Sequence, residues 1–343
     1  MQIKDRVYHK RYSRKKFVHE QKRKGKPYKG YFYDGHIERP RFSNQEVRPP
    51  KQKKIVMPET FSLIDATSET IEFFHEIFEK ISEHKPIFID ARDVQRITPD
   101  AIIYFILILE EIKEKHERFR IRGNLPKEKK CRSMMRESGF MNYVRGPDGS
   151  YTENTRIFTI REGTNVKPEV AKNILDYVRT HLGIQGKTNE TKAIYSVIIE
   201  AMANTHNHAT IGSLVHEQKW YLMAYYTDQD EVHFVFLDSG VGIPKTIRKN
   251  YKERIAKLFS GRSTKDHILI HSALSGDFRT STGEHKRGKG LPKMRSLSEA
   301  GEINDFVILS NKGIVSIGRK EQSPLERKFH GTLISWKVQR KNR

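Results

Sequence analysis

Residues 191–209 read TKAIYSVIIEAMANTHNHA, and this stretch decides the fold of the C-terminal half of the chain. Its apolar residues recur at helical spacing and form one face of a predicted helix. Glu200, Asn204 and His208 stand four residues apart, with Asn207 between the last two. At 100° per residue these four side chains share a sector of about 100°. Asn is a poor helix former, so its presence here indicates a binding stripe rather than a solvated face.

A second stretch delivers a carboxylate into a glycine turn. Residues 232–237 predict a buried strand, and Asp238 follows directly, ahead of Gly240 and Gly242. Glycine permits backbone angles and close ligand approach that other residues do not allow. Taken alone, such a turn is common, so it gains meaning only beside the other stretches.

A third stretch is a glycine-rich loop that leads into a helix. Residues 286–292 read KRGKGLP and run into an amphipathic segment that ends at Gly301. Pro292 suits the first turn of a helix, and Gly301 suits its C-terminal cap. A glycine-rich loop at a helix N-terminus can bind an anion, although the loop alone reads equally well as a flexible connection.

Together, in this order, the three stretches resemble the GHKL ATPases, the family of gyrase, the heat-shock chaperone of ninety kilodaltons, histidine kinases and MutL. The spacings between the stretches fit that family over residues 155–338. The resemblance implies a Bergerat fold, a two-layer α/β sandwich with a mixed, mostly antiparallel sheet. The pattern Glu-x-x-x-Asn-x-x-x-His is most similar to that of the anti-sigma-factor kinases.

The resemblance implies an ATP site with Mg²⁺ and a role for each matched residue. Glu200 is the expected catalytic residue, which orients or activates water or a protein hydroxyl. Asn204 is expected to coordinate Mg²⁺, and Asp238 to accept the adenine amino group. The other expected nucleotide-binding residues come from the turn, the loop and a late Gly-Thr motif: Gly240, Gly242, Gly288, Lys289, Gly290, Leu291 and Thr332.

Further elements of this half follow from the same pattern. Two hairpins are expected, Trp220–Tyr226 with Val232–Leu237 and Phe306–Ser310 with Ile314–Gly318. The segment 259–287 is rich in Ser, Gly, Thr and His and has little apolar periodicity. It is expected to be a mobile lid that orders over bound nucleotide.

Residues 55–150 alternate strand and helix signals, which predicts a small sheet layered with helices. Three helices are expected, at Ser68–Glu83, Pro99–His116 and Lys127–Gly139. The strands are expected at Ile55–Met57, Pro86–Asp90 and Phe119–Arg122.

This block resembles STAS domains, in a strand that ends at Asp90, a turn before a long helix, and a late Ser138-Gly139-Phe140. In signalling members of that family, a Ser or Thr in the turn is phosphorylated. The aligned position here is Asp100, so the chain departs from the switchable pattern. The block is therefore expected to act as a scaffold or dimer interface.

Charge is concentrated before this block. Residues 1–54 hold 18 Lys or Arg against five Asp or Glu, a net charge of +13 out of +22 for all 343 residues. Aromatic residues alternate with the basic clusters, so this arm could bind nucleic acid or pack on a protein. Cys131 is the only cysteine, and no apolar run is long enough to span a membrane. These features predict a cytoplasmic protein without a membrane anchor.

Three functions remain open at this point. The first is an ATPase, fused to a STAS-like domain, whose nucleotide state switches its lid and its contacts with a protein partner or a second copy. The second is a serine/threonine protein kinase of the anti-sigma-factor type. The third is a nucleic-acid-binding module of residues 1–54 that ATP regulates.

Overall fold

The computed structural model describes residues 32–33, 53–83, 86–115, 121–145, 156–209, 218–260, 264–278 and 289–340; of residues 32–33, 145 and 206–209 it describes the backbone alone. Most of the basic arm lies outside these ranges, as does Gly288. None of the described helices combines the length and the apolar character that a membrane crossing requires.

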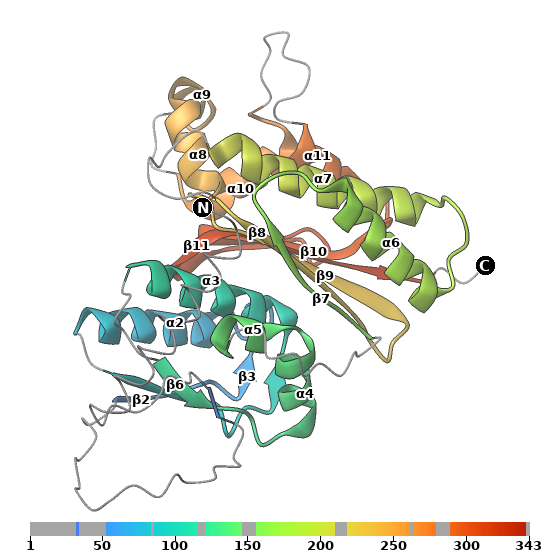
Figure 1. Ribbon diagram of the computed structural model, residues 1–343. Coiled ribbons are helices and arrows are strands. Elements are labelled where there is room, and N and C mark those ends of the chain that lie inside the picture. The colour runs from blue at the N-terminus through green and yellow to red at the C-terminus, as the bar shows by residue number, and fades with distance from the viewer. Residues whose placement is uncertain are drawn as a thin grey trace, which may run out of the picture.

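The N-terminal unit, residues 53–145, is built around a parallel sheet of strand order β1-β6-β4-β2 (Figure 1). Its strands are β1 (Phe32–Tyr33), β2 (Lys53–Val56), β4 (Ile87–Asp90) and β6 (Ile121–Asn124), with a separate pair β3 (Thr60–Phe61) and β5 (Arg96–Ile97). Its helices are α2 (Thr67–Ser82), α3 (Pro99–Lys115), α4 (Lys129–Glu137) and α5 (Phe140–Arg145). The edge strand β1 comes from the basic arm, so part of that arm pairs with the sheet.

Two of the expected N-terminal helices begin within one residue of their predicted starts. The third, expected at Lys127–Gly139, is α4, which is two residues shorter at each end, and a further helix that was not expected, α5, follows it. Gly139 stands between them with φ +91°, a left-handed conformation that interrupts a helix.

The C-terminal unit, residues 156–340, contains a five-stranded sheet of order β10-β11-β9-β8-β7. Its strands are β7 (Ile157–Gly163), β8 (Trp220–Tyr226), β9 (Glu231–Asp238), β10 (Asn304–Ser316) and β11 (Glu321–Gln339). Its helices are α6 (Pro168–Leu182), α7 (Asn189–Ala209), α8 (Ile243–Asn250), α9 (Lys252–Leu258), α10 (Asp266–Ser275) and α11 (Gly290–Glu299). The α/β class is confirmed, and all pairings among the described strands of this sheet are antiparallel.

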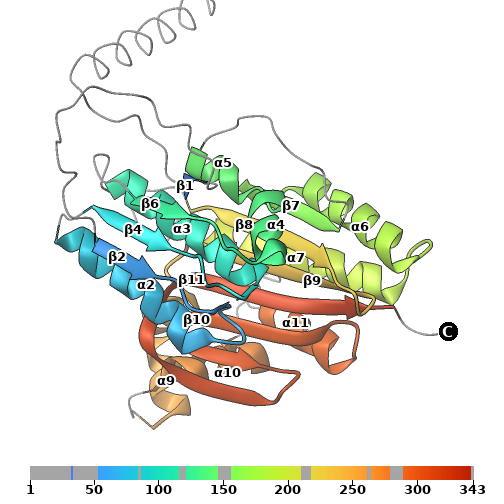
Figure 2. The same cartoon turned by 90° about the horizontal axis from the view of Figure 1, so that it is seen from below.

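Helices cover both faces of the antiparallel sheet. Helices α6, α7, α10 and α11 lie on one side, and α3 of the N-terminal unit lies against the other (Figures 1 and 2). All residues of α3 from Ala101 to Leu109 are buried. A helix that is apolar all round needs contacts on every side, and α3 obtains them between the two sheets. Apolar residues of both units therefore form one continuous core.

The first expected hairpin, β8 with β9, is confirmed, but the second is wrong. The segments expected as its two arms belong to the single strand β10, which pairs with β11. The Asn-Lys-Gly sequence between them is a bulge in that strand, with Asn311 at φ +50°. A bulge and a hairpin turn both use residues that tolerate positive φ, so their sequence signals coincide.

The expectation of a mobile lid at residues 259–287 is wrong for the part of this segment that contains α10. The middle of the expected segment forms α10, in which Leu269, Ile270 and Leu274 are buried. This helix is apolar on more than one side because it packs against β10, α8 and α11. A mobile lid is therefore not found at residues 264–278, and residues 279–288 lie outside the described ranges.

Candidate functional site

A half-buried carboxylate lies where strand β9 ends. Asp238 is the last residue of β9 and pairs with Trp220 on one side and Thr332 on the other. The backbone amide of Gly240 donates to its Oδ1 at 2.7 Å. Burial raises the pKa of the Asp238 carboxyl to about 6, against the opposing effect of the hydrogen bonds from Gly240 and Thr332. The carboxylate is thus a hydrogen-bond acceptor that is partly removed from water.

The late Gly-Thr motif crosses the backbone of Asp238 at close range. Gly331 has φ +83°, and a Cβ placed on it would lie 1.9 Å from the carbonyl oxygen of Asp238. Only glycine fits there. Beside it, the buried Thr332 Oγ1 lies 3.1 Å from the hydroxyl of Ser310. Asp238, Gly240 and Thr332, which the sequence predicted for one site, are therefore adjacent in the structure.

The glycine turn after Asp238 rests on two residues that sequence reasoning missed. Asn311 Nδ2 donates to the carbonyl of Val241 at 3.0 Å, and its Oδ1 accepts the backbone amide of Lys245 at 3.3 Å. Ser310 Oγ accepts the amide of Ile243 at 2.9 Å. A Cβ on Gly242, which has φ +90°, would lie 2.5 Å from Asn311 Oδ1.

A signal for these two residues was present in the sequence. Ser310 and Asn311 are polar, yet they follow directly on an apolar run and are buried in the structure. Buried polar side chains are usually held by specific hydrogen bonds, so their position at the end of a strand could have marked them as supports.

The polar stripe of α7 faces the beginning of α11. A Cβ on Gly290 would lie 2.7 Å from Glu200 Oε2 and 3.6 Å from Asn204 Nδ2. Gly290 is the first residue of α11, which carries no side-chain cap. The first amides of a helix lack internal partners and carry partial positive charge. Glu200 and Asn204 are both half-buried, so a small ligand can reach them and the helix end together.

The remaining predicted residues divide into three groups. Lys289 is exposed at the start of α11, and Leu291 is half-buried behind Gly290. Gly288 lies outside the described residues. The side chains of Asn207 and His208 also lie outside the described part, although α7 extends through both. No direct contact places Lys289 at the site.

The region combines a helix N-terminus, which can attract an anion, with a carboxylate that can accept a hydrogen bond. Within the described ranges, no group of three or more His, Cys, Asp or Glu could hold a metal ion on its own. Asn204 lies beside Gly290, with Nδ2 at 3.6 Å from the Cβ position of that glycine, and its side chain also carries an amide oxygen that can bind a cation. Mg²⁺ commonly binds through one or two protein ligands together with phosphate oxygens and water. The residues therefore fit a Mg²⁺ ion that arrives with a nucleotide.

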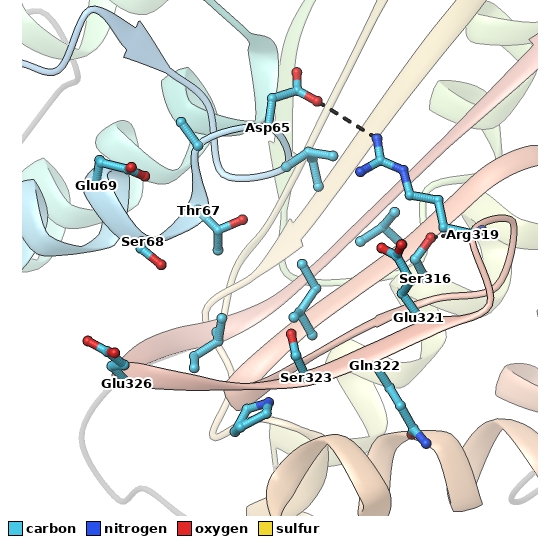
Figure 3. Close-up of a pocket in the computed structure, with 16 residues that line it drawn as sticks. Asp65, Thr67, Ser68, Glu69, Ser316, Arg319, Glu321, Gln322, Ser323 and Glu326 are labelled. Atoms are coloured by element: carbon cyan, nitrogen blue, oxygen red, sulfur yellow. Dashed lines mark hydrogen bonds and ion pairs between the residues drawn. The ribbon is translucent and has the colours of Figure 1, made fainter.

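A separate groove of about 480 Å³ lies at the contact between the two units. It runs between the start of α2 and the hairpin formed by β10 and β11 (Figure 3). Its polar lining includes four carboxylates, and Arg319 reaches across it to Asp65 at 3.9 Å. None of the residues predicted for the nucleotide site lines this groove.

Comparison with known proteins adds little. No family model matches the chain, and no curated protein matches it. Three solved chains match its structure. One is the histidine kinase domain from the Erythrobacter litoralis EL346 blue-light activated histidine kinase, with 12% identity over 70% of this chain and 85% of that chain. Its TM-score is 0.26, and a likeness at that level carries no argument about function.

Proposed function

We propose that residues 156–340 bind ATP together with Mg²⁺ and hydrolyse it. The observation that carries this proposal is the position of Gly290. This first residue of α11 lies against Glu200 and Asn204 of α7, so a phosphate-binding helix end faces a carboxylate and an amide. Helix N-termini bind phosphate groups through their free amides and their dipole.

The base would bind at the other cluster. The half-buried Asp238 lies on the helix-covered side of the sheet, because side chains alternate along β9 and Phe236 belongs to the core under the helices. Its carboxylate would accept a hydrogen bond from the adenine amino group, which favours adenine over guanine. Thr332 and Ser310 would support this contact from β11 and β10.

The residues near the phosphates would divide the chemical work. Asn204 would hold Mg²⁺, and that ion, when bound, neutralises charge on the phosphate oxygens. Glu200 would orient the attacking water and accept its proton. The α11 amides would hold the anion in place without a change in protonation.

Isothermal titration calorimetry with ATP and MgCl₂ tests the proposal. The wild type should bind ATP, and Asp238→Asn should lose at least tenfold in affinity, since a hydrogen bond to a charged acceptor contributes about 1.5–3 kcal/mol. Asp228→Asn is the matched control, because this exposed carboxylate lies in the turn at the other end of the same strands. A wild type that binds no ATP would refute the proposal. Equal affinities for wild type and Asp238→Asn would show that the adenine does not bind at Asp238.

Hydrolysis is favoured over phosphorylation of the chain itself by the burial of Asp100. The residue aligned with the phosphoacceptor of signalling STAS domains is a carboxylate, 5% exposed, whose Oδ1 accepts the amide of Leu63 at 2.6 Å. Incubation with ATP labelled at the γ-phosphate separates the two activities. Released phosphate indicates an ATPase, whereas label on this protein or on an added partner indicates a kinase.

A further inference from the structure

Gln218 carries a buried oxygen that has no donor among the described residues. The residue lies two positions before strand β8 begins and is 7% exposed. Its Oε1 is buried and makes no hydrogen bond with any described group. An unpaired acceptor in a dry site is unfavourable, and most buried polar groups in folded proteins have a partner. A ligand is one source of the missing donor.

The strand pairing places Gln218 beside the proposed base site. Trp220 pairs with Asp238, and one step further the backbone amide of Ser239 donates to the carbonyl of Lys219 at 2.9 Å. The next step brings Gln218 opposite Gly240. Because side chains alternate, Gln218 shares the helix-covered face with Trp220, which belongs to the core under the helices.

Two acceptor oxygens approach the same empty position. A Cβ on Gly240 would lie 3.3 Å from Gln218 Oε1 and 2.6 Å from Asp238 Oδ1. The carboxylate oxygen already has a donor in the Gly240 amide, whereas the Gln218 oxygen has none. A group with two N–H donors on one nitrogen can serve both side chains, and a primary amine on an aromatic base is such a group.

We infer that Gln218 is a second specificity-determining residue for the base, whose Oε1 accepts one hydrogen of the adenine amino group while Asp238 accepts the other. This inference rests on the proposed ATP site and deepens it. The site would then recognise an unsubstituted amino group rather than any purine with one N–H at that position.

The test compares three nucleotides with the full-length protein by calorimetry in the presence of MgCl₂. ATP offers two amino hydrogens, N6-methyl-ATP offers one, and purine riboside triphosphate offers none. Gln218→Met removes the acceptor while keeping a side chain of similar length. Gln229→Met makes the same change in the exposed turn between β8 and β9 and serves as the control.

The expected result is a loss that depends on the nucleotide. Gln218→Met should weaken ATP binding about tenfold, the usual effect of one hydrogen bond. It should change the affinity for purine riboside triphosphate less than twofold, and it should abolish the preference for ATP over N6-methyl-ATP that the wild type shows. Gln229→Met should match the wild type with all three ligands.

Other outcomes overturn the inference. If the amide is turned so that its nitrogen supports Asp238, Gln218→Met lowers the affinities for ATP and N6-methyl-ATP by the same factor, and the preference for ATP is kept. If Gln218→Met lowers the affinities for all three nucleotides by the same factor, Gln218 only stabilises the fold. If the wild type binds ATP and Gln218→Met has the same affinity as the wild type for all three nucleotides, the role of Gln218 is refuted but the proposed function is not. If the wild type binds no nucleotide, the proposed function is refuted as well.

Discussion

Asp238 shows how a single residue can be prepared for a ligand by the fold around it. Burial raises the pKa of its carboxyl to about 6, so much of the desolvation that ligand binding requires has occurred on folding. Gly240 and Thr332 oppose this shift and keep the carboxylate ionised near neutral pH. An incoming N–H donor stabilises the ionised form further, which favours binding of a base that carries an amino group.

Glu200 allows the catalytic part of the proposal to be separated from the binding part. Glu200→Gln keeps the size of the side chain but removes the proton acceptor. ATP affinity should stay within a few-fold of the wild type, while the rate of phosphate release should fall by about 10²–10⁴. A coupled phosphate assay gives the rate, and calorimetry gives the affinity.

A matched control keeps that experiment specific. Glu169→Gln makes the same change at an exposed position in the first turn of α6 and should leave the rate unchanged. Turnover by Glu200→Gln at the wild-type rate would show that Glu200 is not the base.

At the scale of elements, periodicity predicted the helices α2, α3 and α7 and the β8–β9 hairpin well, because each buries one or more faces at a regular spacing, whereas α6 was not predicted. The carboxylate, the glycine turn and the α7 stripe were also predicted, since each is a local pattern. The second hairpin failed because Asn311 has positive φ in a bulge, where it supports the glycine turn through two hydrogen bonds.

Features that depend on contacts between distant segments could not be predicted. The apolar residues of α10 are not confined to a single face, because several neighbouring elements enclose the helix. Its sequence therefore shows no helical periodicity and resembles that of a loop. Gln218 has no local motif at all, and its place beside Gly240 follows only from the register of two strands. Register is a property of the paired sheet, not of either strand alone.

The beginning of α3 gives a prediction on stability and pH. Burial raises the pKa of the Asp100 carboxyl from 3.8 to about 6. Because the folded pKa exceeds the unfolded one, the penalty for the buried carboxyl is full above pH 6, decreases as the pH falls from 6, and is lost below the unfolded pKa of 3.8. Asp100→Asn keeps an oxygen that can accept the Leu63 amide but carries no charge.

Urea unfolding at two pH values measures this effect. At pH 7.5, Asp100→Asn should be more stable than the wild type by about 3 kcal/mol, the order of magnitude that a shift from 3.8 to about 6 represents. At pH 5, where the unfolded carboxyl is still ionised, about half of this difference should remain. All other titrating groups are common to both proteins, so a gap that is the same at both pH values would contradict the assignment.

On the scale of the whole molecule, α3 joins two sheets into one structure. Tyr104 of α3 stacks on Phe329 of β11 with ring centroids 4.3 Å apart, and its hydroxyl accepts the amide of His330 at 3.1 Å. Farther along α3, Glu110 accepts hydrogen bonds from Lys219, at 3.2 Å, and from Tyr221. These contacts involve residues that are close in the chain to Thr332 and to Gln218. The N-terminal unit therefore supports the strands of the proposed site.

This arrangement predicts that the two units unfold together, and the tryptophans allow a direct measurement. Both Trp220 and Trp336 lie in the C-terminal unit, so their fluorescence reports on that unit alone. Tyr104→Ala, in the N-terminal unit, should nonetheless lower the fluorescence-detected stability by about 3–5 kcal/mol, since it removes a buried aromatic ring. Tyr104→Phe keeps the stacking and should cost only about 1–2 kcal/mol, for the unpaired His330 amide.

Circular dichroism at 222 nm, which reports on the helices of both units, should give the same midpoint as fluorescence for each protein. Two separate transitions, with a fluorescence midpoint that Tyr104→Ala leaves unchanged, would show that the units are energetically independent and that α3 does not support the site.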